Sequence, residues 1–269
     1  MTRLGTSGTD LSVAAERGTR ASSPIDLIFV DVTAVAPLLE DAEAANRYLS
    51  PNDLSRAAER ATHVQDGGVW RFGRIALRIA LERHLGARFR GKEFEIESGG
   101  RPRVPGSAVQ FSYSHSGRAA LIAITEASPV GVDLEERRLL RMTAERQARI
   151  ETAGAALAPG HPLTGDNLAR GLQAWVRLEA AAKLYGRGIG DALTHAGVMG
   201  VRKPEGQRLD DQTRGRAAGV VVRDLQMPEG CDGYFAAIAA PHLPETLDAM
   251  PFPLTPNALQ RFLVRDDGA

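Results

Sequence analysis

The chain has 269 residues, of which 43% are hydrophobic and 25% are charged, and its formal net charge at pH 7 is zero. This is the composition of an ordinary globular protein with one large domain or two modest ones. A neutral chain lacks the broad positive field that attracts nucleic acids and anionic membranes, so we expect neither as a partner.

The single cysteine, Cys231, excludes an internal disulfide and a cysteine-based zinc site, and it fits a reducing cytoplasm. No run of about 18 apolar residues is present, so the sequence predicts no membrane span. Residues 1–24 are rich in Thr, Ser, Gly and Arg and lack the apolar core of a secretory signal. We therefore expect a cytoplasmic protein with a flexible N-terminal tail at residues 1–24.

The part of the chain that follows this tail alternates helix and strand signals. The apolar run Ile25–Val32 predicts a strand, and Ser50-Pro51 supplies an N-cap and a first helical residue. An apolar face from Val69 to Leu85 predicts a helix that Gly86 ends. Further strands are expected at 94–96, 109–114 and 119–125, the last two joined by a turn at 116–118.

The next part begins with a strand at 130–135 and contains a helix around Glu179. Between them, Ala153 to Pro162 is rich in Ala, Gly and Pro and is predicted to be a mobile loop. Helices that pack on mostly antiparallel strands define an α+β fold class. Later strands are expected near 196–201, 218–225 and 233–239. Beyond Pro241, apolar side chains favour docking of the tail onto the body: Leu243, Leu247, Phe252, Leu259 and Phe262.

Two acidic motifs carry most of the functional information. In Gly131-Val132-Asp133-Leu134-Glu135 the apolar residues alternate with the others, which is typical of a strand and places both carboxylates on one face. In the segment from Trp175 to Lys183, the residues Trp175, Glu179 and Lys183 recur every four positions and share one stripe of a helix.

These motifs suit a metal and a phosphate. The strand carboxylates of Asp133 and Glu135 and the helix carboxylate of Glu179 can converge on a hard cation such as Mg²⁺, which takes substrate phosphates as further ligands. Lys183, one turn beyond Glu179, adds a point charge suited to a phosphate.

Plainer interpretations exist for each residue. Asp133 and Glu135 also fit the solvated face of an edge strand. Glu179 and Lys183 also fit an exposed i,i+4 ion pair worth about 0.3 kcal/mol. Trp175 fits a core position better than a contact with a ligand.

Together the motifs resemble those of the 4′-phosphopantetheinyl transferases of the surfactin-synthetase-activating type. The resemblance runs in order from Gly100 to Ile189 and is looser at Leu49-Ser50-Pro51 and Gly233–Ala237. Its parts are Gly100-Arg101-Pro102 with Pro105, then Phe111-Ser112-Tyr113-Ser114-His115-Ser116, then Gly131–Glu135, then Trp175–Lys183 followed by Gly186-Arg187-Gly188-Ile189. The chain departs from the family pattern where Leu178 replaces a usual Lys, with Arg177 beside it, and where Ser112 replaces Asn.

The resemblance implies a fold and an activity. The implied fold has two similar α+β halves related by pseudo-twofold symmetry, with the cofactor in the cleft between them. We place the halves at residues 25–128 and 129–240, with a C-terminal tail at 241–269. The implied activity is transfer of the 4′-phosphopantetheine arm of coenzyme A to a serine of an acyl, aryl or peptidyl carrier protein. Mg²⁺ would be the cofactor, coenzyme A the co-substrate, and the enzyme a monomer.

The resemblance also implies roles for individual residues. Asp133, Glu135 and Glu179 would hold Mg²⁺, and Glu179 would in addition be the general base, directly or through a metal-bound water. Lys183, His115 and Ser114 would contact the pyrophosphate, and Arg101 another phosphate. Asp133, Glu179 and Lys183 are thus the expected catalytic residues.

The helix predicted at 69–85 carries Arg71, Arg74 and Arg78 at positions i, i+3 and i+7 of one face. Such a stripe fits either a solvated surface or a cationic wall for the 3′-phosphate of coenzyme A, and Arg71 and Arg74 are included among the expected cofactor contacts.

Two other classes of protein fit parts of the sequence. A Mg²⁺-dependent nucleotide phosphohydrolase would need the acidic cluster but no carrier. A non-catalytic module that binds carrier proteins would require a broken site, and the intact trio of Asp133, Glu135 and Glu179 argues against it. For the transferase, the stretch from Ala153 to Pro162 lies between the two acidic motifs and is placed, as a mobile loop, to border a docking surface for the carrier.

Overall fold

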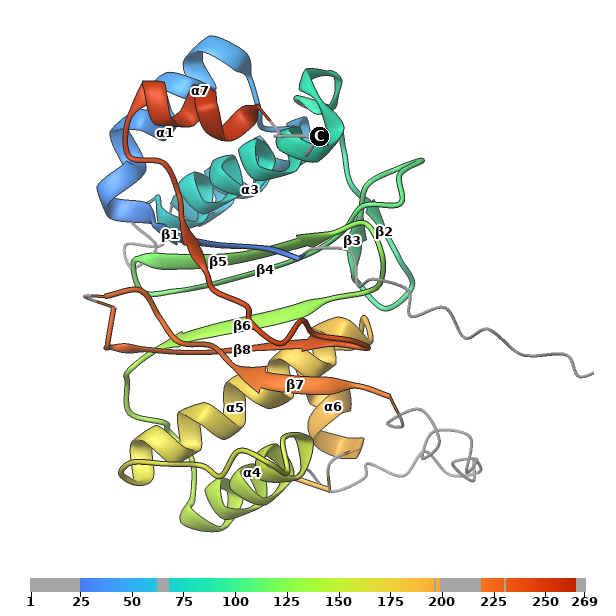
Figure 1. Cartoon of the computed structure of the whole chain (residues 1–269), viewed down its shortest axis with the longest axis vertical. Helices are drawn as coiled ribbons and strands as arrows, with labels where there is room; N and C mark the ends of the chain where they lie inside the picture. Colours follow the sequence, from blue (N-terminus) through green and yellow to red (C-terminus); the bar gives the residue numbers. More distant parts are fainter. Residues whose placement is uncertain (1–24, 62–67, 196, 199–218, 230, 265–269) are drawn as a thin grey trace, which may run out of the picture.

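The computed structural model describes residues 25–61, 68–195, 197–198, 219–229 and 231–264, and these form a mixed α+β structure (Figure 1). The flexible tail expected at residues 1–24 and most of the strand expected near 196–201 lie outside the described residues. No helix in the described ranges is both long enough and apolar enough to cross a membrane.

The first large sheet has the strand order β4-β5-β1-β9. Its central strand β5 is buried along its whole length, because helices cover one face and a second sheet covers the other. Its strands are β1 (Asp26–Asp31), β4 (Gln110–Ser116), β5 (Ala119–Thr125) and β9 (Met250–Pro251). The covering helices are α1 (Val32–Asn46), α3 (Val69–Leu85) and α7 (Pro256–Leu263), and α2 (Pro51–Ala61) packs on α3.

The local signals of this region are confirmed for α2 and α3. The Ser50 hydroxyl accepts from the Asp53 backbone N–H at 3.2 Å and caps α2. Helix α3 ends at Gly86, whose positive φ of 73° a glycine tolerates best. Helix α1 was not predicted, because Pro37 lies inside it and obscures the periodicity of its buried residues.

A short hairpin projects from this region. After the 3₁₀ turn η1 (Ala87–Phe89), strands β2 (Glu95–Ile96) and β3 (Pro102–Arg103) pair antiparallel. The turn between them contains Gly99 and Gly100. A side chain at Gly99 would overlap the carbonyl oxygen of Gly186, so the hairpin tip touches the segment that follows α5.

The second large sheet has the order β6-β8-β7, with strands β6 (Gly131–Glu136), β7 (Val221–Asp224) and β8 (Tyr234–Ala240). Helix α5 (Asn167–Leu184) lies on its outer face. Gly131 permits this close approach, because a Cβ there would overlap the Ala180 carbonyl oxygen. Helix α4 (Ala144–Leu157) packs on α5, and α6 (Ile189–His195) follows α5 along the chain.

The mobile loop predicted at Ala153–Pro162 is wrong for its first half. Residues up to Leu157 belong to α4, and Ile150 on this helix is completely buried. Gly154 lies against the backbone of Ala174, where a Cβ would clash. The small residues at this end of α4 therefore allow close packing against α5. A segment rich in Ala and Gly is equally typical of a loop, so composition alone does not distinguish the two.

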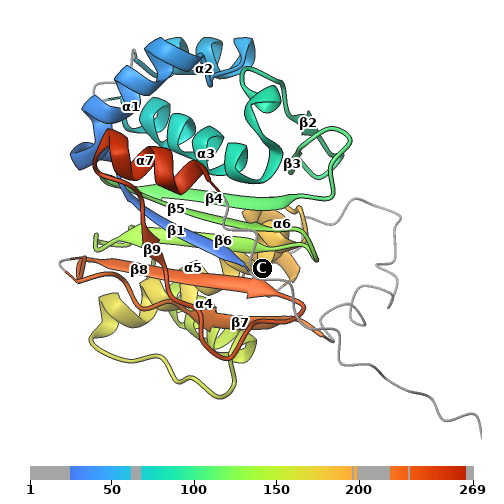
Figure 2. The same cartoon turned by 45° about the horizontal axis from the view of Figure 1, so that its top comes forward.

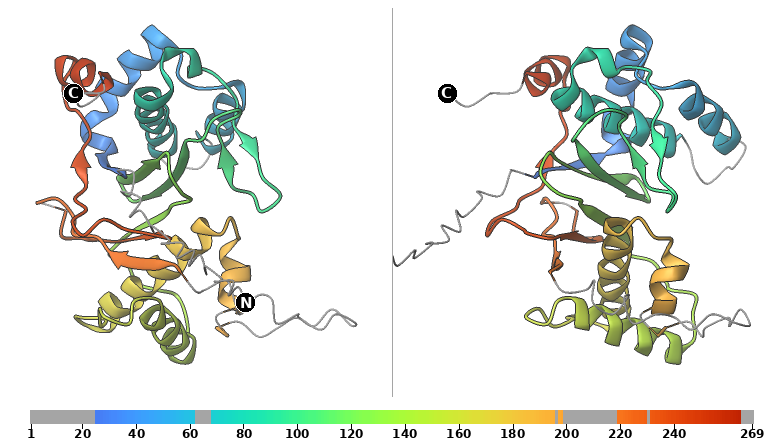
Figure 3. Two further views of the ribbon diagram at one scale, coloured as in Figure 1. Left: turned by 45° about the vertical axis from the view of Figure 1, so that its right-hand side comes forward. Right: turned by 90° about the vertical axis from the view of Figure 1, so that its right-hand side faces the viewer.

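The described elements stack as helices, first sheet, second sheet and helices (Figure 3). Alternation along the strands produces these layers: Phe29 faces the second sheet, whereas Ile28 faces the helices. The C-terminal segment returns to the first sheet, where β9 pairs parallel with β1 and α7 lies beside α3 (Figure 2). Phe252 and Leu259 of this segment are buried in the first core.

The two large sheets share one order of pairing. In each, the first strand along the chain pairs antiparallel with the third, the third pairs with the second, and helices connect the first to the second. The strands are β1, β4 and β5 in one sheet and β6, β7 and β8 in the other; β9 is an addition from the C-terminal segment.

Alternate serines of β4 connect it to β6. The backbone N–H groups of Val132 and Glu136 donate to the hydroxyls of Ser112 and Ser116, each at 3.0 Å. The Ser114 hydroxyl lies between them along the strand and donates to Asp133. Since β4 and β6 form no ladder with each other, these side chains supply the hydrogen bonds that align them.

Candidate functional site

Asp133 lies at the centre of a buried polar cluster between β4, β6 and α5. Its Oδ1 accepts from the Ser114 hydroxyl and from the Lys183 ammonium, both at 2.7 Å, and Lys183 Nζ lies 2.9 Å from Ser114 Oγ. Asp133 is only 4% exposed. Its other oxygen, Oδ2, is buried without a hydrogen-bond partner in the described part of the chain. A buried carboxylate oxygen without a partner is costly, which makes this atom a candidate ligand for a cation.

The environment of Asp133 opposes its ionisation in part. Burial raises the pKa of its carboxyl, whereas the Lys183 charge and the hydrogen bonds from Lys183 and Ser114 lower it. The negative charge of Glu135 raises it again. Lys183 therefore supplies most of the compensation for the buried negative charge.

Glu179, one turn before Lys183 on α5, is a second carboxyl with altered acidity. Burial is the main reason why its pKa rises from 4.5 to about 7, and repulsion from Asp133 and Glu135 adds to this, against the opposing charge of Lys183. Its proton therefore exchanges near neutral pH, which is the range that suits a general base.

Glu135 has partners of its own. It accepts from the Ser116 hydroxyl at 2.9 Å and forms an ion pair with Arg138 at 3.0 Å. The carboxylates of Asp133, Glu135 and Glu179 are close enough to repel one another. Even so, no group of three His, Cys, Asp or Glu side chains in the described residues is arranged to hold a metal ion. The carboxylate donors and the unpartnered Oδ2 of Asp133 fit a hard cation. In this structure Lys183 pairs with Asp133 and Arg138 pairs with Glu135.

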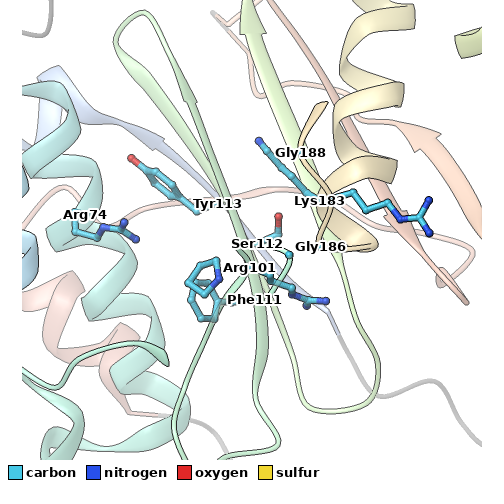
Figure 4. A pocket seen from close by; sticks show the side chains of 12 residues that line it. Arg74, Arg101, Phe111, Ser112, Tyr113, Lys183, Gly186 and Gly188 are labelled. Carbon is cyan, nitrogen blue, oxygen red and sulfur yellow. The ribbon is translucent and has the colours of Figure 1, made fainter. Parts of the chain in front are cut away.

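A pocket opens beside this cluster, bounded by α3, β4, the β2–β3 hairpin and the end of α5 (Figure 4). Figure 4 shows Arg74 entering from α3 and Lys183 from α5, with Ser112 and Tyr113 of β4 between them. The described lining contains four cationic side chains and no carboxylate: Arg74, Arg101, Lys183 and Arg187, together with Gly99, Gly100, Pro102, Phe111, Ser112, Tyr113, Gly186 and Gly188. Such a lining favours an anionic ligand.

Arg101 is held in this pocket by two acceptors. It donates to the Leu184 carbonyl at 3.3 Å and to Gln110 Oε1 at 3.1 Å. Burial lowers the pKa of its guanidinium, opposed by Glu97. Because its two acceptors are neutral, the charge remains available to an anion.

The three arginines of α3 do not form one wall, contrary to the cationic stripe expected from their spacing. Arg71 pairs with Glu40 of α1 and does not line the pocket. Arg78 is buried against Asp53 at 2.6 Å. Only Arg74 lines the pocket. The partner of Arg71 lies on α1, whereas the partner of Arg74 and Arg78 lies on α2. The spacing of the arginines along α3 does not predict which of them faces the pocket.

Arg74 is itself well packed. It lies 3.2 Å from Asp53 Oδ1 and within 6 Å of the rings of Trp70 and Tyr113. Burial lowers the pKa of its guanidinium, and the Asp53 carboxylate opposes this shift. Arg74 is thus a preorganised charge in the wall of the pocket.

Ser114 and His115 point to opposite sides of β4. Ser114 faces Asp133 and is 6% exposed, whereas the His115 ring lies edge-on to Tyr113 at 5.6 Å between centroids. His115 is not among the residues that line the pocket. The structure therefore brings Ser114 together with the acidic cluster and places His115 beside Tyr113, on the other face of β4.

The departures from the family pattern also have a structural explanation. Leu178 is buried in the core between α4 and α5, and Arg177 is fully buried in a two-point ion pair with Asp224 of β7, at 2.7 and 2.6 Å. Arg177 therefore does not substitute for the missing Lys at the site. Trp175 packs against the same core, as its position in the helix favours.

Arg187, Ser112 and Tyr113 line the pocket, although no role in ligand binding is predicted for them from the sequence. A signal existed for Arg187, because it lies between two glycines in the segment after α5, and Gly186 has a positive φ of 63°. Tyr113 could have been found from alternation, since it shares a face of β4 with Phe111.

No protein-family model matches this chain, and no curated protein matches it. Its function is therefore inferred from the motifs and from the geometry described above.

Proposed function

We propose that this protein transfers the 4′-phosphopantetheine arm of coenzyme A to a serine of an apo acyl, aryl or peptidyl carrier protein and releases adenosine 3′,5′-bisphosphate. The proposal joins the ordered motifs from Gly100 to Ile189 to the geometry of the site. The observation that carries it is the position of Lys183, which bonds to the buried Asp133 carboxylate and also lines a pocket. Among the described residues, the charged side chains of that pocket are all cationic.

The cationic pocket supports binding of the coenzyme A phosphates. Arg74 comes from α3, Arg101 from the hairpin, and Lys183 and Arg187 from the end of α5. Guanidinium groups match phosphate geometry with two donors, and the lysine adds a point charge. Gly100 and Gly188 leave the backbone open to a bulky anion, because no atom lies within 4 Å of the place where a Cβ would stand.

The acidic cluster supports the chemical step. The carrier serine oxygen would form a bond to the phosphorus next to the pantetheine arm, while the bond from that phosphorus to the bridging oxygen of the pyrophosphate breaks. Glu179, whose pKa is about 7, would take the serine proton. Asp133, Glu179 and Glu135 are the residues that would hold Mg²⁺, which when bound neutralises charge on the pyrophosphate. Lys183 and Arg101 would hold phosphate oxygens in place.

We further propose that the shared strand order reflects two halves related by pseudo-twofold symmetry, with coenzyme A in a cleft between them. The equal pairing order of the two large sheets supports this, as does a pocket whose lining comes from both sides of the β4–β6 contact. The partner would be a carrier protein that docks on a monomeric enzyme in the cytoplasm and leaves after each turnover.

One incubation tests the proposal. The protein is mixed with coenzyme A, Mg²⁺ and an apo carrier protein, and the carrier mass is followed. A gain equal to the phosphopantetheine arm is expected. Loss of coenzyme A or nucleotide without a carrier would instead indicate a phosphohydrolase. Carrier binding without any mass change would indicate a binding module.

A further inference from the structure

Lys183 connects the two parts of the candidate site. Its ammonium bonds to Asp133 and Ser114, and the same side chain lines the cationic pocket. An ammonium group has three N–H donors and no acceptor, so two donors are used toward the acidic cluster. One donor therefore remains for a partner on the pocket side, and the same ammonium lies within reach of both ligand positions.

Asp133 keeps one carboxylate oxygen that no described group uses. Its Oδ1 is held by Lys183, and its Oδ2 is buried with no partner among the described residues. A cation that binds this carboxylate meets the Lys183 ammonium at short range, and like charges in a partly buried site repel strongly. Lys183 is 29% exposed and carries a flexible four-carbon stem, so its head can leave the carboxylate for the pocket.

We propose that Lys183 is an exchangeable partner of Asp133, displaced from the carboxylate by a divalent cation and received by an anion in the pocket. The inference rests on the cation site of the proposed function and adds a coupling between two ligands. Anion binding draws Lys183 into the pocket and so favours the cation, and by linkage the cation favours the anion equally. Direct attraction between the two ligands also couples them, but that attraction does not require Lys183.

Binding of Mn²⁺ to the full-length protein at pH 8 tests the exchange without any carrier or turnover. Lys183→Met removes the ammonium and keeps the stem. We expect it to tighten Mn²⁺ binding about tenfold in a chloride buffer, within the usual range of about 5 to 150-fold for coupled sites. Lys183→Arg keeps the competing charge and should bind Mn²⁺ as weakly as the native protein. Arg101→Met is the matched control, because Arg101 lines the same pocket without contacting Asp133, and it should change the affinity by less than about threefold.

Sulfate provides the second measurement. Replacing chloride by sulfate at equal ionic strength, with correction for Mn²⁺ bound by sulfate in solution, should tighten Mn²⁺ binding to the native protein about fivefold or more. The same exchange should have a clearly smaller effect on Lys183→Met.

Three results would overturn the inference: Lys183→Met binds Mn²⁺ no more tightly than the native protein, Arg101→Met tightens binding as much, or the sulfate effect persists in full without Lys183. Failure of every folded variant to bind Mn²⁺ would remove both the cation site and the inference. If the expected Mn²⁺ pattern is found but no carrier gains mass from coenzyme A, the exchange stands and the proposed function fails.

Discussion

Helices α3 and α5 each pack on one of the two large sheets, yet they carry different side chains toward the site. Each carries one fully buried arginine, Arg78 on α3 and Arg177 on α5, paired with an aspartate. Beyond this shared feature, α3 adds the cation Arg74 to the pocket, whereas α5 adds Lys183 to the pocket and Glu179 to the acidic cluster beside it. Both helices therefore place a cation in the pocket wall, and α5 alone adds a carboxyl with a raised pKa and a direct contact with Asp133.

The positive charges of the two buried arginines are neutralised by aspartates and are not available to a ligand. Arg78 and its partner Asp53 are both almost completely buried, whereas Asp224, the partner of Arg177, is 36% exposed. Both pairs hold a helix in place. An arginine on the correct helix is thus a functional candidate only if its charge faces the pocket.

The largest effect should come from breaking the more deeply buried pair. We expect Arg78→Ala to lower the free energy of unfolding by about 3–5 kcal/mol, because it leaves Asp53 buried without its main partner. Arg177→Ala should cost less, since water can reach Asp224. Chemical denaturation of both variants checks the order. An equal or larger loss for Arg177→Ala would contradict this difference between α3 and α5.

Removing the central carboxylate should affect turnover more than folding. Asp133→Ala should lower carrier modification by a factor of about 10² or more at limiting Mg²⁺, the scale expected for one preorganised electrostatic group. Its fold should persist, because Lys183 is partly exposed and can be hydrated. Mass spectrometry of the carrier measures the rate, with Glu145→Ala on the exposed face of α4 as a control. Near-native turnover of Asp133→Ala would exclude its role.

The raised pKa of Glu179 predicts a pH-dependent stability. In the folded, metal-free protein this carboxyl keeps its proton up to about pH 7, whereas in the unfolded chain it ionises near 4.5. The stabilising contribution of Glu179 is therefore complete below about pH 4.5 and is lost as the pH rises through about 7. Its size should be on the order of 1 kcal/mol after allowance for partial exposure.

Glu179→Gln cannot ionise and isolates this contribution. With a chelator present, the difference in unfolding free energy between native and Glu179→Gln protein should shift between pH 4.5 and pH 8 in favour of the variant at high pH. Denaturant titrations at several pH values measure this difference. A difference that does not change with pH would show that Glu179 ionises normally.

The smallest effects separate pocket cations from surface cations. Arg101→Ala should weaken coenzyme A binding about tenfold, in line with a charged hydrogen bond worth about 1.5–3 kcal/mol. Arg71→Ala should leave it nearly unchanged, because Arg71 pairs with Glu40 outside the pocket and exposed ion pairs contribute about 0–1 kcal/mol. Calorimetry with coenzyme A decides. Equal losses in both variants would mean that the pocket extends to Arg71.

Local signals in the sequence determined the α+β class and many of the elements. Alternation identified β6 and the shared face of Asp133 and Glu135, and the four-residue repeat identified the stripe of Glu179 and Lys183 on α5. Gly86 marked the end of α3. These features depend on residues a few positions apart, and their physical cause is the geometry of one strand or one helix. Helix α4 was missed because small residues fit both a loop and a close helix contact.

Only the tertiary structure decided which side chains meet. The contact of Ser114, Asp133 and Lys183 joins three elements, and the pocket adds the tip of a hairpin to the end of α5. It also assigned different partners to Arg71, Arg74 and Arg78, although their spacing places them on one helix face. Such choices depend on the packing of distant segments and on burial, which set the strength of each charge–charge contact. Neither quantity is encoded in the spacing of residues along the chain.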